Sequence, residues 1–313
     1  MISGKTVLSV MITIVKYIFF ASISYILLYP FLFLLTTSLK SVSDAYDVTV
    51  SWVPKTLYFG NFGLGLKAFE YLKSFGNTII YELIPSLLEF AACAVAAYGL
   101  SRFKLRINGL LTGLLILNIL VPSIMIIIPS YVNFSSVDFL GILGLISKAV
   151  GKELRPSLIN TPWVFYLPSI CGVGLRGGLF IYIFSQFFKS MPKELEEAAA
   201  IDGAGAWKTF FTIVLPSAGA AMITVLLFTI VCHYNDYYLA QMYTNQKTLA
   251  VSVNGFSGEA IISTLELDSN TGGMYMVQVL ASGCVLYMVP LLIFYIAMQK
   301  KFVASVANSG IVG

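Results

Sequence analysis

Long apolar stretches separated by short polar ones dominate the pattern of this chain. A helix needs about 20 apolar residues to cross the hydrocarbon core of a bilayer, and it satisfies its own backbone polar groups there. The pattern predicts six such helices, over residues 17–39, 77–101, within 107–137, 161–188, 209–235 and within 269–299. We therefore expect an all-α integral membrane protein, with residues 1–313 forming a single transmembrane domain.

The composition supports a membrane protein. Hydrophobic residues make up 58% of the chain and charged residues only 11%, whereas soluble domains carry roughly 25% charged residues. The net charge of +4 is small, so the expected partner is a lipid bilayer and no nucleic acid. The four cysteines lie in apolar stretches without metal-ligand spacing, which is typical of small buried side chains. No metal site is predicted.

The placement of basic residues predicts the orientation. Arg102, Lys104 and Arg106 follow the second apolar stretch, and Lys300 and Lys301 follow the sixth. Loops rich in Lys and Arg stay in the cytoplasm. Six helices with both termini cytoplasmic satisfy this rule, which also puts the tail at 303–313 and the polar segment at 189–215 in the cytoplasm. The first apolar run is too long for a cleaved signal peptide, so we expect an uncleaved span.

The polar segment at 189–215 has the pattern of a short helix. Ser190 and Pro192 are typical of a helix start, and the alanines at 198–200 are strong helix formers. Gly203 can adopt the left-handed conformation that ends a helix. Helix should resume over 204–212, with Pro216 at a bend. The product is a short helix across the cytoplasmic mouth, suited to hold a soluble partner; a plain interfacial helix is the alternative.

Charged residues within the spans suggest a polar path, because such residues are costly in lipid. Glu89 and Arg176 fall near mid-depth, and we expect them to pair. The pair could be a clamp between helices or a polar rung that binds sugar hydroxyls. Glu82 should reach headgroups or water, and His233 is expected at an interface, with sugar contact as the alternative. The candidate translocation path consists of Glu89, Arg176, Tyr234, Asn235 and Asp236.

A sequence motif in the polar segment resembles a known element. Glu197-Ala-Ala-Ala-Ile-Asp-Gly203, followed by Ile213-Val-Leu-Pro216, resembles the EAA loop of ABC importer permeases. In that family the loop helix seats in a groove of an ATP-hydrolysing subunit, whose closure drives the permease from inward-facing to outward-facing. The resemblance implies that the coupling residues are Glu197, Ala198, Ala199, Ala200, Asp202 and Gly203.

Further stretches are similar to the permeases of carbohydrate importers. They are Ala96-Ala-Tyr-Gly-Leu-Ser-Arg-Phe103, Pro129-Ser-Tyr131, Tyr234-Asn-Asp-Tyr-Tyr238, Thr248-Leu-Ala-Val251 and Ser309-Gly-Ile-Val-Gly313. The core permease region is then about 75–302, and it resembles the smaller six-helix permease of the maltose importer. The segment that starts at Arg176 and ends at Phe188 suggests the oligosaccharide or polysaccharide branch. The tail lacks the usual lysine, Tyr234 replaces the usual tryptophan, and the polar insertion at 147–156 is unusual.

The resemblance implies the type I ABC importer permease fold and a non-catalytic transport subunit. No GxxxxGK[ST] motif is present, so ATP and Mg would bind to partner ATPase subunits and no cofactor to this chain. The implied partners are a second permease in a heterodimer, two ABC ATPase subunits, an extracytoplasmic solute-binding protein and a carbohydrate substrate, expected to be an oligosaccharide. The expected location is the cytoplasmic (inner) membrane of a prokaryote, as a multi-pass protein.

Three other interpretations fit parts of the pattern. An ABC importer permease for a non-sugar solute would share the loop. An ion-coupled secondary transporter would show repeats or broken helices around several buried acids. A structural or enzyme-anchoring membrane subunit would not require the loop motif. Binding of an ATPase subunit separates the importer interpretations from the other two.

Overall fold

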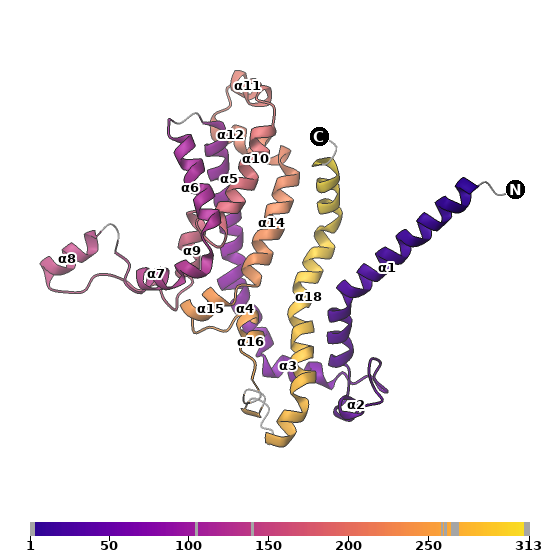
Figure 1. Ribbon diagram of the computed structural model, residues 1–313. Helices are drawn as coiled ribbons and strands as arrows, with labels where there is room; N and C mark the ends of the chain where they lie inside the picture. Colours follow the sequence, from indigo (N-terminus) through magenta and orange to yellow (C-terminus); the bar gives the residue numbers. More distant parts are fainter. Residues whose placement is uncertain are drawn as a thin grey trace. The chain divides into compact units, whose positions relative to one another are not determined.

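The computed structural model describes residues 4–103, 106–138, 141–257, 259, 262–263 and 269–309. Over these residues the regular elements are all helices (Figure 1), which confirms the expected all-α class. The chain forms two compact units. Unit 1 comprises Met1–Tyr71 with Gly255–Val289, and unit 2 comprises Leu72–Asn254 with Pro290–Gly313. The single transmembrane domain stays a prediction. So does the cytoplasmic tail, whose residues 310–313 lie outside the described residues.

Unit 1 contains a long apolar helix and two short ones. These are α1 (Gly4–Ser38), α2 (Val42–Tyr46) and α3 (Gly60–Ala68), together with the first part of α18 (Ser269–Ser309). Buried polar contacts fix the loops: Asn61 Nδ2 donates to the carbonyls of Ser38 (2.9 Å) and Lys40 (2.8 Å). Ser282 Oγ on α18 donates to the Asn61 carbonyl (2.9 Å). Buried backbone carbonyls thus receive the donors that they require.

Unit 2 contains the remaining helices. In chain order they are α4 (Tyr71–Thr78), η1 (Ile79–Leu83), α5 (Ile84–Arg102), α6 (Asn108–Leu120), α7 (Ser123–Ser135), α8 (Ile142–Val150), α9 (Trp163–Ile170), α10 (Gly177–Ser190), α11 (Glu194–Ile201), α12 (Ala206–Thr209), η2 (Phe210–Val214), α13 (Leu215–Ser217), α14 (Gly219–Tyr234), α15 (Tyr238–Tyr243) and α16 (Leu249–Asn254). Helices α5, α10 and α14 pack against one another, and α11 caps one end of this bundle (Figure 1).

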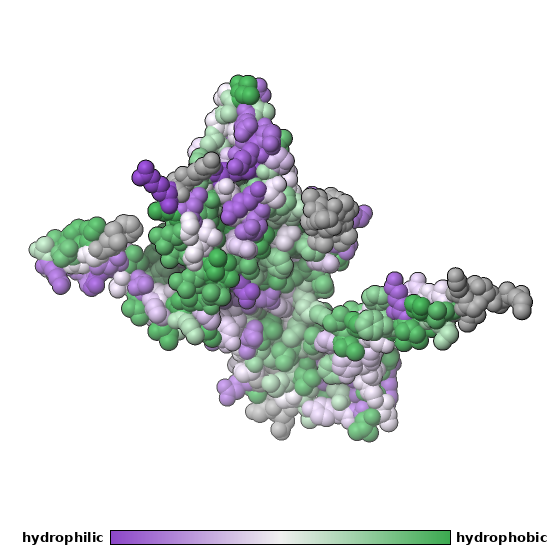
Figure 2. Space-filling view, turned by 45° about the horizontal axis from the view of Figure 1, so that its top comes forward, coloured by the Kyte–Doolittle hydropathy of each residue, from purple (hydrophilic) through white to green (hydrophobic). Residues whose placement is uncertain are grey.

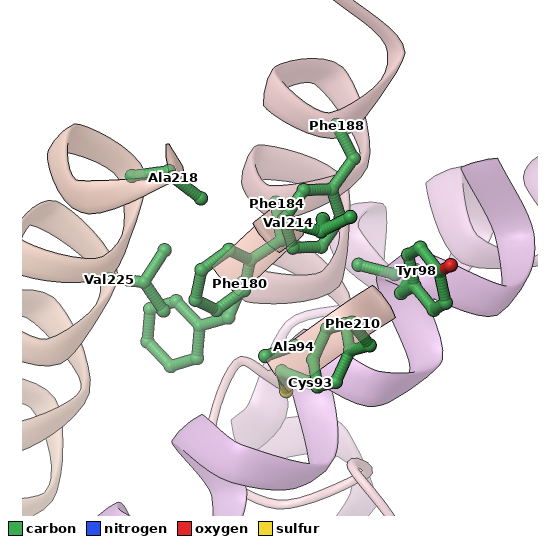
Figure 3. Packing of buried hydrophobic residues seen from close by; sticks show 12 residues of the cluster. Cys93, Ala94, Tyr98, Phe180, Phe184, Phe188, Phe210, Val214, Ala218 and Val225 are labelled. Atoms are coloured by element: carbon green, nitrogen blue, oxygen red, sulfur yellow. The ribbon is translucent and has the colours of Figure 1, made fainter. Parts of the chain in front are cut away.

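Aromatic side chains of α10 form the centre of the unit 2 core (Figure 3). Phe180, Phe184 and Phe188 recur every fourth residue, so they share one helix face, and all three are fully buried. Small side chains of α5, including Ala94 and Ala97, let this helix approach them closely. In lipid, such close packing rather than the hydrophobic effect holds helices together. The core therefore sets α5, α10 and α14 at fixed positions.

The spans agree with the predicted stretches in part. By length and composition, Leu8–Ser38, Tyr71–Arg102 and Gly272–Phe302 are each able to cross a membrane. Two bent pairs, Asn108–Leu120 with Ile124–Ser135 (104°) and Ala206–Ser217 with Gly219–Tyr234 (84°), raise the number among the described residues to five if each pair is one span. The expected fourth span is instead divided into α9 and α10. The count of six and the cytoplasmic termini stay predictions.

Proline positions explain both π-helical segments. η1 ends at Leu83, two residues before Pro85, and η2 ends at Val214, two residues before Pro216. Proline has no N–H to donate, and its ring crowds the carbonyl of the preceding turn. A wider π-turn just before the proline makes room for that carbonyl. The chain then passes into α14 through the 84° bend, as the position of Pro216 predicts.

The polar insertion carries an exposed ion pair. Arg155 Nε donates to Glu153 Oε1 at 2.6 Å, and Nη2 donates to Oε2 at 2.9 Å. These hydrogen bonds from Arg155 lower the pKa of Glu153 to about 2. The pair therefore stays charged at any physiological pH, although exposed pairs of this kind add little stability.

Candidate coupling and translocation sites

Helix α11 begins later than the sequence predicts. Ser190 is the last residue of α10, and its Oγ donates to the Phe187 carbonyl at 2.7 Å, so it cannot cap the following helix. Met191 before Pro192 is extended, as a residue preceding proline tends to be. α11 starts at Glu194. The predicted N-cap at Ser190 is therefore wrong, because a side chain that bonds back into its own helix is not available for the next one.

The end of α11 confirms the prediction for Gly203. Gly203 has φ +75°, a left-handed conformation that favours glycine. Its N–H donates to the Ala200 carbonyl (3.0 Å), and the next N–H, of Ala204, donates to the Ala199 carbonyl (2.9 Å). This pair of bonds is the Schellman motif, which satisfies carbonyls left without partners at a helix end. The alanines and the glycine thus specify where the helix stops.

Most residues of α11 are exposed, except Ala199, which is buried, and Glu196, which is partly buried. Ala199 is buried, whereas the other five residues of the predicted coupling set are exposed: Glu197, Ala198, Ala200, Asp202 and Gly203. Ile201 at the last turn is 87% exposed. Hydrophilic residues gather at this end of unit 2, and hydrophobic ones cover its flanks (Figure 2). The role of these residues in coupling stays a prediction.

An ion pair that the sequence did not predict ties α11 to α5. Arg102 Nε lies 2.6 Å from Glu196 Oε1, with both side chains largely buried, although the N–H is not aligned for a hydrogen bond. Arg102 Nη2 also donates to the Met191 carbonyl (3.2 Å). The only sequence signal for a role of Arg102 was its place in the stretch 96–103, which resembles carbohydrate permeases. The last residue of α5 therefore holds both the entry to α11 and its first turn.

Reversing this ion pair tests whether it positions α11. We expect Glu196→Arg to lower substrate import about tenfold, the scale of one lost charged interaction. Combining it with Arg102→Glu should restore most of the import. Import into vesicles gives the measurement, and Glu194→Arg, an exposed acid on the same helix, is the control. A double variant no better than Glu196→Arg would contradict the positioning role.

Glu89 is paired, but with His233 and not with Arg176 as expected. His233 Nε2 lies 2.6 Å from Glu89 Oε2, and both side chains are at most 5% exposed. The pair joins the middle of α5 to the end of α14. Arg176 forms no ion pair with Glu89 or with any other described residue. The expectation failed because Glu89 and His233 are 144 positions apart in the chain, and spacing along the sequence does not reveal such a contact.

Glu82 is buried, which contradicts its expected position at the membrane boundary. It is 1% exposed, and its Oε2 lies 3.7 Å from His233 Nδ1. Neither carboxylate oxygen has a hydrogen-bond partner. Glu82 and Glu89 are seven residues apart, about two helical turns, so both project from one helix face toward α14. That spacing was the signal that both carboxylates would meet the same neighbour.

Two glycines let the loop after α9 close over Glu89. A Cβ on Gly174 would lie 2.8 Å from Glu89 Oε2, and a Cβ on Gly177 would lie 2.8 Å from Oε1. Any side chain there would push the loop off the carboxylate. Gly177 is also the first residue of α10, whose positive end stabilises a nearby negative charge. Glu89 is therefore a junction of α5, α10 and α14.

Two of the other predicted path residues, Asp236 and Arg176, line cavities. Asp236 is buried, accepts the Leu239 N–H at 3.2 Å, and lines a cavity of about 340 Å³ together with His233 and Tyr243. Arg176 lines a second cavity, of about 630 Å³. Tyr234 is buried in α14. Asn235 donates to the Val231 carbonyl at 2.8 Å. Glu89 and Asp236 thus lie on either side of His233, and Arg176 lines a cavity that shares Ile126, Val173 and Gly174 with that of Asp236.

Known proteins are similar to this chain in sequence and in fold. Residues 90–308 match the family model described as binding-protein-dependent transport system inner membrane component. The chain belongs to this family. It is therefore a transport permease subunit and a multi-pass membrane protein.

Two relatives of this family member are sugar permeases by name. The chain is 31% identical over 289 residues to the melibiose/raffinose/stachyose import permease protein MelC of Bacillus subtilis, covering 91% of each chain. It is 26% identical to the trehalose transport system permease protein SugB of Mycobacterium tuberculosis, covering 91% of this chain and 93% of the relative.

A solved structure supports the fold. A bacterial ABC transporter involved in the import of the acidic polysaccharide alginate matches with a TM-score of 0.69 and 20% identity, over 93% of this chain and 96% of the other. This likeness confirms the expected permease fold.

Proposed function

We propose that this chain is the membrane permease of an ATP-driven importer for carbohydrate, with an oligosaccharide as the expected cargo. Its relatives carry melibiose, raffinose, stachyose and trehalose in their names. The matched transporter structure concerns an acidic polysaccharide. These names support the sugar class and leave neutral and acidic sugars both open. The proposed location is the cytoplasmic membrane of a prokaryote.

The exposed helix α11 carries the proposal that transport is driven from outside this chain. α11 presents Glu197, two alanines and Ile201 to solvent and is held at its base by Arg102. Because α11 is fixed to α5, a movement of a soluble subunit bound to α11 would displace α5 as well. ATP and Mg would be bound by two partner ATPase subunits, with no cofactor on this chain.

Helix α5 is the element that carries the movement into the membrane in this proposal. Arg102 at its end holds α11, and Glu89 in its middle holds His233 on α14. The two residues are 13 positions apart, about 20 Å along a helix. Tilting α5 would therefore shift α11 and the Glu89–His233 junction together. A second permease and an extracytoplasmic binding protein complete the proposed importer. The two permeases form two gates that open alternately, and ATP binding shifts the populations of the inward-facing and outward-facing states.

Reconstitution tests the proposal. The chain is purified with the proteins encoded beside its gene and placed in proteoliposomes that contain ATP. We expect uptake of labelled oligosaccharide that requires both ATP and the binding protein. Uptake driven by an ion gradient without ATP, or a preparation that contains no ATPase subunit, would overturn the proposed function. ATP-driven uptake of a non-sugar solute alone would overturn the substrate class.

A further inference from the structure

Arg176 falls within the fourth predicted span, at the break between α9 and α10, and it lines a cavity. It immediately precedes α10, whose 14 residues lead to the α11 end of unit 2. At 1.5 Å per residue this is about 21 Å, roughly two thirds of a hydrocarbon core about 30 Å thick. A guanidinium at this depth is beyond easy reach of lipid headgroups on that side. Such residues normally face a polar cavity and meet a partner charge.

The cavity around Arg176 offers no negative charge. It measures about 630 Å³, and Arg176 is the only charged residue among the described residues that line it. No acidic side chain of the described chain lies within ion-pair distance of the guanidinium. The nearby carboxylate of Glu89 is engaged by His233 instead. A positive charge is therefore presented to a space of ligand size.

The backbone holds Arg176 at this position despite an unfavourable conformation. Its φ is +63°, a left-handed conformation that residues other than glycine rarely adopt. Gly177 packs against the carbonyl of Gly172, and Gly178 packs against Asn118 of α6. These two contacts fix the start of α10 and with it the direction in which the chain presents Arg176. Strain of this kind is typical of functional positions.

The polar groups of this cavity suit a carboxylate. A guanidinium binds a carboxylate through two parallel N–H bonds. Asn118 also lines the cavity and adds an amide that can donate to the same group or to a sugar hydroxyl. The remaining lining residues are mainly aliphatic, such as Leu114, Leu117 and Leu179. A neutral sugar would leave the arginine without a partner of opposite charge in this cavity.

We propose that Arg176 and Asn118 form a binding site for the carboxylate of an acidic sugar unit on the translocation path. The inference rests on the proposed function and narrows its substrate class to oligosaccharides that contain uronate residues. The site selects cargo within the membrane: an acidic ring satisfies Arg176 as it passes, and a neutral ring does not.

The test compares two forms of one glycan in the reconstituted importer with its ATPases and binding protein. The probes are an oligohexuronate and the same oligosaccharide with its carboxylates reduced to alcohols. We expect Arg176→Gln to lower import of the acidic form roughly 10- to 100-fold, the range for one lost charge-assisted pair. Arg176→Lys should recover part of it. Arg155→Gln, the same change at an exposed arginine, is the control and should leave import unchanged.

Each outcome decides between the alternatives. Equal import of both glycans by the wild-type importer, or import of the neutral form alone, would overturn the inference and leave the proposed function intact. Absence of any ATP-driven glycan uptake would instead overturn the proposed function. Loss of the second permease from purified Arg176→Gln complexes would show that Arg176 pairs with an acid of that subunit, which also overturns the inference.

Discussion

Replacing Gly203 by valine is expected to weaken the binding of the partner ATPase by about 5- to 30-fold and to lower transport by a similar factor. Gly203 has φ +75°, and a left-handed conformation costs an L-residue roughly 1–2 kcal/mol. A β-branched side chain is among the least tolerated there. The last turn of α11 would unwind, and the exposed face with Ile201 would lose its shape. Co-purification of the ATPase and vesicle uptake give the two measurements.

Gly205 provides the matched control for this prediction. It lies two residues further on, with φ −74° and ψ 166°, which suit a β-branched residue. A Cβ there would meet nothing within 4 Å. Gly205→Val should therefore bind the ATPase and transport like the wild type. If both valine variants behave alike, the helix end at Gly203 is not what the ATPase requires.

Replacing Glu89 by methionine is expected to destabilise the protein by about 3–5 kcal/mol, the usual cost of removing one member of a buried ion pair. Methionine has nearly the shape of glutamate but leaves His233 Nε2 without the acceptor at 2.6 Å. A second replacement, His233→Met, should recover most of the loss because neither member of the pair is then left without the other. Thermal unfolding in detergent gives the measurement, with denaturant titration to convert the shift into a free energy.

Glu82→Met is the matched control, because it makes the same substitution at a buried glutamate with different contacts. Its oxygens accept no hydrogen bond, and its distance to His233 is 3.7 Å. Glu82→Met removes a buried carboxyl that has no donor, so it should alter stability by less than about 1 kcal/mol or raise it. A larger loss at Glu82 than at Glu89 would contradict the assignment of Glu89 as the junction of the three helices.

Local features of the fold could be predicted from the sequence because local chemistry determines them. The end of α11 follows from alanines before a glycine, and the bend before α14 follows from Pro216. The start of α11 was placed at Ser190 because serine is a common cap, and its bond to Phe187 was not visible in the sequence.

Contacts between distant segments could not be predicted in the same way. Glu89 was matched to Arg176 because the two lie at similar depth in their predicted spans, although a histidine can also pair with a carboxylate. The choice of His233 depends on how α14 packs on α5, which in turn depends on Phe180, Phe184 and the other core residues. The division of the fourth stretch between α9 and α10 depends on Gly172 and on the conformation of Arg176. The position of a residue along its predicted span was therefore not enough to predict its partner.

Cross-linking from Ile201 tests the central claim, that α11 docks on a separate ATPase, most directly. Ile201 is 87% exposed in the isolated chain. It is replaced by cysteine in the assembled importer, and a short thiol-reactive photo-cross-linker is attached to it. The account predicts a covalent adduct with the ATP-binding subunit, with a yield that changes when ATP is added. An adduct with lipid or with the second permease only, unchanged by ATP, would contradict it.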